Sequence, residues 1–99
     1  MGLEWKTLNV KMPPSCEIYR NDIRRFMQAM LYKLDKNANK GRWQDVDIIG
    51  YLAKLSLEFK ELEEAIQQGN TVNILLEAAD VANFALIIAS KELDGDKND

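Results

Sequence analysis

Two pairs of carboxylates, each spaced three residues apart, are the side chains of this sequence best suited to chemistry. Glu58 and Glu61 form the first pair, and Glu77 and Asp80 form the second. Residues three apart lie on the same face of an α-helix, about one turn from each other. If the two helices that carry these pairs pack side by side, four carboxylates can converge on one place.

The segment that carries the second pair is apolar almost all round. Between residues 74 and 89 its polar side chains are Glu77, Asp80 and Asn83, which share one face within about 120°. A helix that is apolar nearly all round is expected to be buried. Because buried carboxylates are costly without a cation, something positive must face Glu77 and Asp80.

A double proline, a polar loop and a Gly-Asn turn divide the chain into helical stretches. Residues 1–14 form an N-terminal arm, and Ser15 can cap a first helix that ends before the loop at residues 37–41. Two further helices complete a domain that spans residues 15–93, and residues 94–99 form a polar tail. The sequence therefore predicts an all-α fold, a small bundle with three main helices per chain.

The two carboxylate pairs fall on the second and third of these helices. Asp45 or Asp47 can cap the second helix, and Thr71 or Asn73 can cap the third. The turn between them, at residues 69–70, is short, so the two helices should pack antiparallel. Antiparallel packing can bring the two carboxylate pairs face to face.

The composition limits which chemistry is available. The chain has 99 residues, 46% of them hydrophobic and 29% charged, which suits one small globular domain with a modest core. It contains no histidine, which excludes Ser-His and Cys-His catalysis and a histidine-containing di-iron site. The single cysteine, Cys16, excludes an internal disulfide and a cysteine zinc cluster. Any catalysis must therefore use carboxylates, amines, hydroxyls and a metal that those groups can hold.

Four carboxylates that converge without histidine or thiolate make an all-oxygen site. Such a site suits hard divalent cations, so Mg²⁺ is the expected cofactor and Mn²⁺ a substitute. Taken alone, the acidic run at residues 61–64 is typical of a solvated helix face, and Glu77 and Asp80 could lie on the surface at a gap in the packing. Because both pairs occur at matched spacing on adjoining helices, metal binding is the favoured interpretation.

The charge balance and the ends of the chain suggest where the protein works. A net charge of −3 argues against binding to a nucleic acid polymer or to an anionic membrane. The first ten residues lack the layout of a signal peptide, and the apolar stretch at residues 74–89 is short for a membrane span. We therefore expect a cytoplasmic protein in which Cys16 is reduced.

The acidic pattern resembles that of the MazG-like nucleoside triphosphate pyrophosphohydrolases, in the all-α NTP pyrophosphatase superfamily. Their signature is Glu-x-x-Glu, a variable spacer, then Glu-x-x-Asp; here it reads EFKE at residues 58–61, fifteen residues, then EAAD at residues 77–80. LEFKELEEAI is similar to the family string EExxELxxAI, and EAADVANFALIIA to EAADVANFAMMIA. KGRW at residues 40–43 resembles the K-G-x-W of short phage and archaeal members, so the resemblance covers residues 40–91.

The sequence departs from the family pattern in two places. Leu57 stands where the family often has a second glutamate, and the N-terminal CPWD-type string of larger members is missing. These departures bear on the choice of substrate more than on the metal site.

The resemblance implies an enzyme that hydrolyses a (deoxy)nucleoside triphosphate to the monophosphate and pyrophosphate, in nucleotide-pool house-cleaning. Glu58, Glu61, Glu77 and Asp80 would hold Mg²⁺, which neutralises phosphate charge and lowers the pKa of a bound water. Glu58 or Glu61 would accept the proton of that water as the catalytic base, and the sequence does not choose between them.

Five further residues are candidates for substrate binding. Each has a plainer alternative role: a hydrogen bond to a backbone or core group for the asparagine, solvent exposure for the lysines beside the helical site, and a core anchor for the tryptophan. The asparagine and these lysines could reach the sugar or phosphates, and the tryptophan could stack on the base. The candidates are Asn83, Lys54, Lys91, Trp43 and the adjacent Lys40.

The family resemblance also implies a homodimer or a homotetramer with sites near the subunit interface. The sequence is compatible with this, since Leu57 lies outside the main apolar stripe of the second helix. The third helix, too, has more apolar surface than one partner helix can cover. The bundle is therefore expected to be completed by homo-oligomerisation.

Two other classes of protein share this pattern. The chain could be a catalytically idle helical regulatory or interaction protein that retains the acidic metal-binding residues. It could also be a metal-binding protein whose ligands only stabilise the fold. Turnover of nucleotides separates the enzyme from both.

Overall fold

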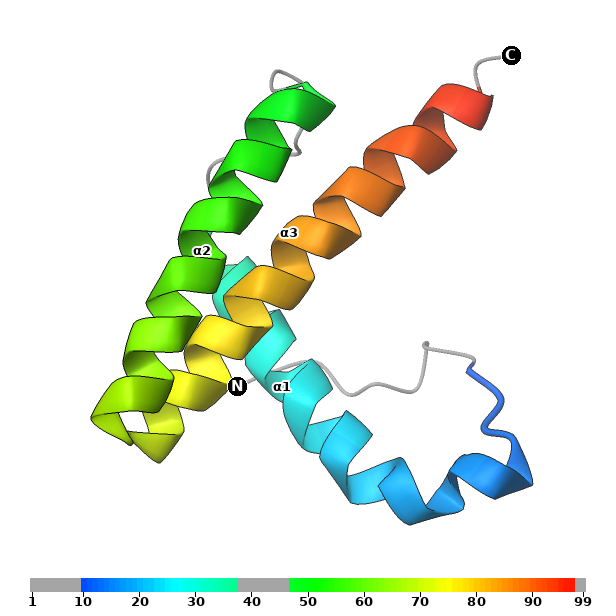
Figure 1. The fold of residues 1–99 in the computed structure, drawn as a ribbon. Helices are drawn as coiled ribbons and strands as arrows, with labels where there is room; N and C mark the ends of the chain where they lie inside the picture. The colour runs from blue at the N-terminus through cyan, green and yellow to red at the C-terminus, as the bar shows by residue number, and fades with distance from the viewer. Residues whose placement is uncertain (1–9, 38–46, 98–99) are drawn as a thin grey trace.

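The computed structural model describes residues 10–37 and 47–97, with side chains described up to residue 93. Within these ranges the chain is helical and contains no strand, which confirms the predicted all-α class with three main helices. The elements in chain order are the 3-10 helix η2 (Pro14–Tyr19) and the helices α1 (Arg20–Lys36), α2 (Ile48–Gln68) and α3 (Thr71–Lys97) (Figure 1).

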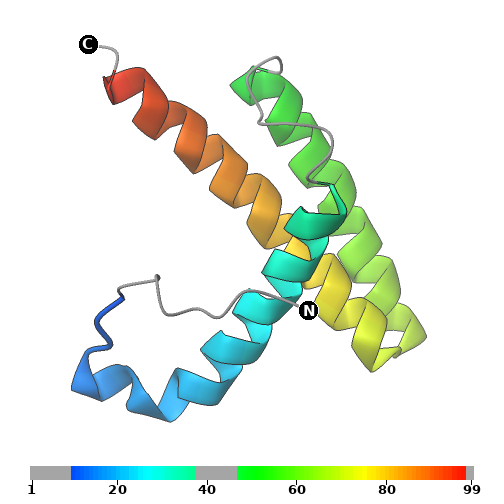
Figure 2. The same ribbon diagram turned by 180° about the vertical axis from the view of Figure 1, so that it is seen from behind.

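The helix α3 is the central element of the fold. It runs antiparallel to α2 and packs against both α2 and α1. The helices α2 and α3 lie closest near the turn that joins them and diverge towards their other ends (Figure 1). Seen from behind, α1 crosses the paired helices at an angle (Figure 2). Residues on the α1-facing side of α3 therefore meet side chains from both other helices.

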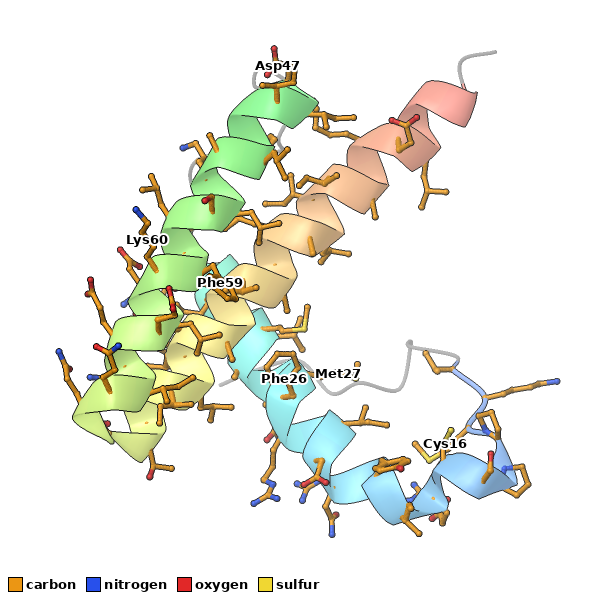
Figure 3. The ribbon with its side chains drawn as sticks, in the orientation of Figure 1. Cys16, Phe26, Met27, Asp47, Phe59 and Lys60 are labelled. Atoms are coloured by element: carbon orange, nitrogen blue, oxygen red, sulfur yellow. The ribbon has the colours of Figure 1, made fainter. Side chains whose placement is uncertain are left out.

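The first helical stretch begins differently from the prediction. Pro13 occupies the N-cap position without a side-chain hydrogen bond, and its carbonyl accepts a hydrogen bond of 2.9 Å from the Cys16 N–H. Ser15, predicted as the cap, lies inside η2, and α-helical geometry starts only at Arg20. Pro14 in the first turn explains this start, because proline has φ preset for a helix and no N–H to satisfy. Cys16 lies on this 3-10 segment (Figure 3).

The helix α2 has a clear signal at each end. Asp47 caps it, since its Oδ1 accepts a hydrogen bond of 2.8 Å from the Gly50 N–H. Of the two predicted caps Asp47 is therefore confirmed, and Asp45 lies outside the described residues. At the other end Gly69 has φ of 74°, a left-handed conformation that glycine adopts without strain. Its N–H donates to the Ala65 carbonyl at 3.0 Å, which closes the helix.

The helix α3 begins at Thr71, which is earlier than a cap at either Thr71 or Asn73 would allow. Asn70 is the cap: its Oδ1 accepts a hydrogen bond of 3.0 Å from the Asn73 N–H. The prediction of Thr71 or Asn73 was wrong, because both residues already lie within the helix. At its other end α3 continues to Lys97, beyond the end expected near Leu93.

The core between the helices is built largely from small side chains. Alanine lets helix backbones approach closely, and the rings of Tyr51 and Phe84 add a tilted aromatic contact with centroids 6.2 Å apart. Among the described residues the buried hydrophobic side chains are Ala29, Tyr51, Ala65, Ala79 and Ile87.

The expectation that α3 is buried all round does not hold for the single chain. Ala79 is fully buried, but Val72 is 63% exposed and Leu93 is 62% exposed. The reason is geometric, since two neighbouring helices cover only part of a helix surface. By length and hydropathy the segment Thr71–Leu93 could also cross a membrane, but core helices of globular proteins meet the same criterion, so this is weak evidence for a span.

Replacing Asn70 with alanine should destabilise the protein by about 1 kcal/mol, because the N-terminal turn of α3 loses its side-chain acceptor. Asn73→Ala is the matched control: its side chain is exposed and is not the cap, so the free energy of unfolding should hardly change. Urea unfolding followed by circular dichroism measures both variants. Equal losses for the two would contradict the assignment of the cap.

Candidate metal centre

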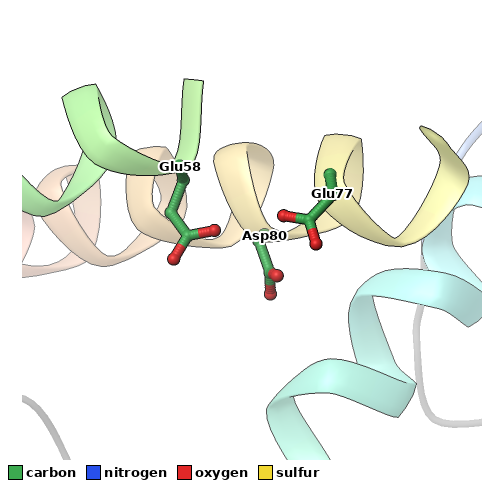
Figure 4. Close-up of side chains that lie close together, drawn as sticks. All are labelled: Glu58, Glu77 and Asp80. Carbon is green, nitrogen blue, oxygen red and sulfur yellow. The ribbon is translucent and has the colours of Figure 1, made fainter. Parts of the chain in front are cut away.

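Three carboxylates from two helices meet at one place in the structure. Glu58 projects from α2, and Glu77 and Asp80 project from α3 (Figure 4). Each offers an oxygen that lies within 4.8 Å of the oxygens offered by the other two, and all three residues are half-buried. We call Glu58, Glu77 and Asp80 the acidic cluster.

The helical hairpin explains why residues so far apart in sequence meet. Glu58 stands eleven residues before Gly69, and Asp80 stands ten residues after Asn70. In an antiparallel hairpin, residues at equal distances from the turn lie at the same level, because each residue advances the helix by about 1.5 Å. The spacing of Glu77 and Asp80 then places both carboxylates on one face of α3.

The fourth predicted ligand, Glu61, lies at the edge of the acidic cluster. It is exposed and does not belong to the group of oxygens within 4.8 Å of one another. Its carboxylate still raises the pKa of both Glu58 and Glu77, through a hydrogen bond to their protonated forms and through its negative charge. The structure therefore brings three of the predicted ligands together and leaves the fourth beside them.

Burial and mutual repulsion shift the acidity of the acidic cluster. Desolvation, together with the hydrogen bond to Glu61 and the charge of Asp80, raises the pKa of Glu58 to about 7. Desolvation and the same two neighbours also raise the pKa of Glu77, and the positive charge of Lys33 acts in the opposite direction. At neutral pH the metal-free cluster therefore carries less negative charge than its three carboxyl groups would carry in water.

Two oxygens of the acidic cluster have no hydrogen-bond partner among the described residues. They are Oε2 of Glu58 and Oε2 of Glu77, and both are buried. A buried polar atom without a partner costs roughly 1–3 kcal/mol, more if it is charged. A divalent cation would satisfy both oxygens at once, so the residues present fit a hard metal ion such as Mg²⁺.

Among the described residues, the positive group that faces the acidic cluster is Lys33 of α1. Its Nζ lies 3.0 Å from Oδ2 of Asp80, and both side chains are about four-fifths buried. Burial by itself would lower the pKa of Lys33, but its hydrogen bond to Asp80 and the negative charges of the acidic cluster outweigh burial and raise that pKa. The need for a positive partner was predicted from the sequence, whereas the residue was not.

A signal for Lys33 exists in the sequence of α1. Lys33 follows Phe26 by seven residues and Met30 by three, so it continues the apolar stripe of this helix. A lysine within an apolar stripe is expected to reach a partner carboxylate or to extend its amine to solvent. The sequence of α1 does not choose between these two outcomes; the packing of α1 against α3 does.

Asn83 makes a structural contact in this arrangement. It is 6% exposed, and its Nδ2 donates a hydrogen bond of 3.0 Å to the carbonyl of Met30. This contact corresponds to the plainer of the two roles considered for Asn83, although its buried Oδ1 has no hydrogen-bond partner within residues 10–37 and 47–97. Asn83 on α3 and Met30 on α1 thus form a second polar link beside the ion pair of Lys33 and Asp80.

Of the four remaining candidates for substrate binding, two lie on the described helices and two lie outside the described residues. Lys54 is exposed about one turn before Glu58 and forms no ion pair with another described residue. The Nζ of Lys91 lies 6.0 Å from the centroid of the Tyr51 ring. Lys40 and Trp43 lie outside the described residues.

Comparison of the chain with protein-family models, curated proteins and solved structures finds no match. The resemblance to MazG-like enzymes therefore stays a prediction from the sequence motifs. Chemically, the acidic cluster can hold a hard cation between α2 and α3, with Lys33 and Glu61 at its edges.

The raised pKa of Glu58 predicts how the stability of the metal-free protein depends on pH. The pKa rises from 4.5 to about 7 on folding, so the folded state holds the proton more tightly than the unfolded state. The resulting stabilisation is complete below pH 4.5 and is lost as the pH rises through about 7. In the presence of a chelator, the midpoint of urea unfolding should therefore be lower at pH 8 than at pH 5.

Two variants control this measurement. Glu58→Gln cannot release a proton, so its midpoint should fall less between the two pH values than that of the wild type. Glu63→Gln removes an exposed carboxylate of the same helix and should keep the wild-type pH dependence. If Glu58→Gln and the wild type respond equally to pH, Glu58 does not have the raised pKa.

Proposed function

We propose that this protein is a Mg²⁺-dependent nucleoside triphosphate pyrophosphohydrolase that releases a nucleoside monophosphate and pyrophosphate. The observation that carries the proposal is the acidic cluster, in which oxygens from Glu58, Glu77 and Asp80 lie within 4.8 Å of one another. The motif resemblance in residues 40–91 supports the same activity. The two acidic motifs of that resemblance lie on α2 and α3, the helices that carry the acidic cluster.

The acidic cluster would hold the metal through Glu58, Glu77 and Asp80, with Glu61 available beside them. A bound divalent cation neutralises phosphate oxygens and lowers the pKa of a water molecule. All these ligands are carboxylate oxygens, which favours Mg²⁺, with Mn²⁺ as a substitute, over zinc or copper. The partly buried position of the cluster strengthens its attraction for a cation, because less water screens the charges.

Glu61 is the best placed group to accept the proton of the attacking water. It is exposed, so a water can reach it, and it lies near enough to Glu58 and Glu77 to raise the pKa of both without belonging to the acidic cluster. A general base has to lie within hydrogen-bond reach of the proton that it takes. Glu58 is less suited to this role, because its carboxylate points towards Asp80 and Glu77 (Figure 4) and its Oε2 is buried.

The exposed apolar surface supports a second copy of this chain as a partner. Three of the five buried hydrophobic residues in the described part are alanines, which is a small core for a chain of this length. Meanwhile Leu52, Leu57 and Phe59 are each more than half exposed on α2. An open groove lies between α2 and α3, and its lining is almost wholly apolar: Leu52, Leu55, Ser56, Phe59 and Val81.

A helical hairpin from a second copy would cover this groove and complete a bundle. Phe59 extends from α2 towards α3 at the groove, whereas the neighbouring Lys60 points to the outer side of α2 (Figure 3). Burying such a surface yields roughly 25 cal/mol per Å² of apolar area. We therefore propose a homodimer or a homotetramer.

The activity is tested with a panel of canonical and modified nucleoside triphosphates in Mg²⁺ or Mn²⁺. Phosphate should appear only when inorganic pyrophosphatase is added, since pyrophosphate is the expected product. Glu58→Gln and Asp80→Asn should lose about 100-fold or more of the activity, because each removes one proposed ligand charge. Glu63→Gln, an exposed position on α2, should retain wild-type activity.

Other results of these assays would favour one of the two alternative classes of protein. A protein that binds metal but turns over no nucleotide would be the idle regulatory helical protein. A melting temperature that collapses on chelation, without nucleotide binding, would indicate a purely structural metal. Full activity in Glu58→Gln would place the active site elsewhere on the chain.

Light scattering after size exclusion tests the second copy. The wild type should have at least twice the 11.3 kDa mass of one chain. Phe59→Asp places a charge in the apolar groove and should shift the protein to the monomer, whereas Ile18→Asp, 80% exposed on η2, should not. A wild type of monomer mass would contradict the proposed oligomer.

A further inference from the structure

The helix α1 reaches the acidic cluster through two polar contacts of equal spacing. On α1, Met30 and Lys33 lie three residues apart, and on α3 Asp80 and Asn83 lie three residues apart. Met30 pairs with Asn83 through a hydrogen bond of 3.0 Å, and Lys33 pairs with Asp80 at 3.0 Å. These two contacts hold α1 in one register against α3.

The two contacts differ in what a cation would do to them. The bond between Asn83 and the Met30 carbonyl involves no group of the acidic cluster, so a cation leaves it in place. The ion pair of Lys33 uses Oδ2 of Asp80, an oxygen of a proposed metal ligand. An ammonium and a divalent cation repel each other, and both are attracted to the same carboxylate.

We propose that Lys33 is a built-in counter-ion that competes with the metal for Asp80 and, once displaced, offers its positive charge to the anionic ligand of that metal. The proposal rests on the metal site proposed above. The asparagine contact keeps α1 docked while the lysine changes partner.

This role gives two effects of opposite sign when the charge of Lys33 is removed. The metal should bind more tightly, because its competitor and a repelling charge are gone. A triphosphate should bind more weakly, because it loses a positive partner. A lysine that only held α1 in place would, on removal, loosen the site and weaken both.

The first test measures the affinity of the protein for Mn²⁺ without nucleotide, by electron paramagnetic resonance of the ion that remains free. Lys33→Met should bind Mn²⁺ roughly tenfold more tightly than the wild type, because it removes a positive charge that repels the ion and competes with it for Asp80. Lys33→Arg keeps the charge and should stay near the wild type. Lys60→Met removes a lysine from the outer side of α2 and should change nothing (Figure 3).

The same variants are then titrated with a non-hydrolysable nucleoside triphosphate at saturating Mn²⁺. Lys33→Met should bind it several-fold more weakly, and Lys33→Arg should restore most of the affinity. Equal or weaker Mn²⁺ binding by Lys33→Met would overturn the proposal while leaving the metal site intact. If neither the wild type nor Lys33→Met binds Mn²⁺, the metal site itself fails, and the proposal fails with it.

A measurement on the wild type avoids any variant that folds poorly. In protein with ¹³C-labelled lysine side chains, adding Mg²⁺ should move the Cε signal of Lys33 and leave that of Lys60 in place. The signal of Lys33 is assigned as the one missing from Lys33→Arg. A Lys33 signal that does not move at saturating Mg²⁺ would show that the metal does not displace it.

Discussion

The repulsion among three half-buried carboxylates is the constraint around which the rest of this structure is arranged. Glu58, Glu77 and Asp80 hold oxygens within 4.8 Å of one another, where two unit charges repel by on the order of 1–3 kcal/mol in a partly screened site. The metal-free protein reduces this repulsion in two ways. The pKa of Glu58 is raised to about 7, so this residue is partly protonated at neutral pH, and Lys33 places an ammonium against Asp80. Both the proton and the ammonium reduce the net negative charge of the acidic cluster.

The apolar packing and the acidic cluster depend on each other. Ala79, fully buried on α3 beside Asp80, has a side chain small enough to let the neighbouring helices come close. Close approach carries the carboxylates out of bulk water, which raises the pKa of both Glu58 and Glu77. The same choice of small residues leaves larger ones such as Phe59 outside the core of the single chain. The small core residues therefore explain both the partly buried carboxylates of the acidic cluster and the large apolar side chains left exposed on the single chain.

The position of α1 connects these features to the proposed chemistry. Through Met30 and Lys33 this helix contacts the polar face of α3, and it contributes both a neutral and a charged link. A neutral hydrogen bond is insensitive to a cation nearby, whereas an ion pair is not. The proposed phosphate chemistry needs negative charge to hold the metal and positive charge to hold the substrate. The described helices supply the two within a few ångströms of each other.

The amino-acid sequence by itself determined the three helices, an aspartate cap for the second at Asp45 or Asp47, the pairing of carboxylates at helical spacing and the need for a positive partner. These features depend on the geometry of one helix or one turn, so residue type and spacing suffice to predict them. The tertiary structure alone decided that Lys33 is the partner, that Glu61 lies at the edge and that Asn83 bonds to Met30. Those outcomes depend on how far each helix is rotated about its axis against its neighbours. That rotation is set by the packing of all three helices at once, which no periodicity within a single segment can reveal.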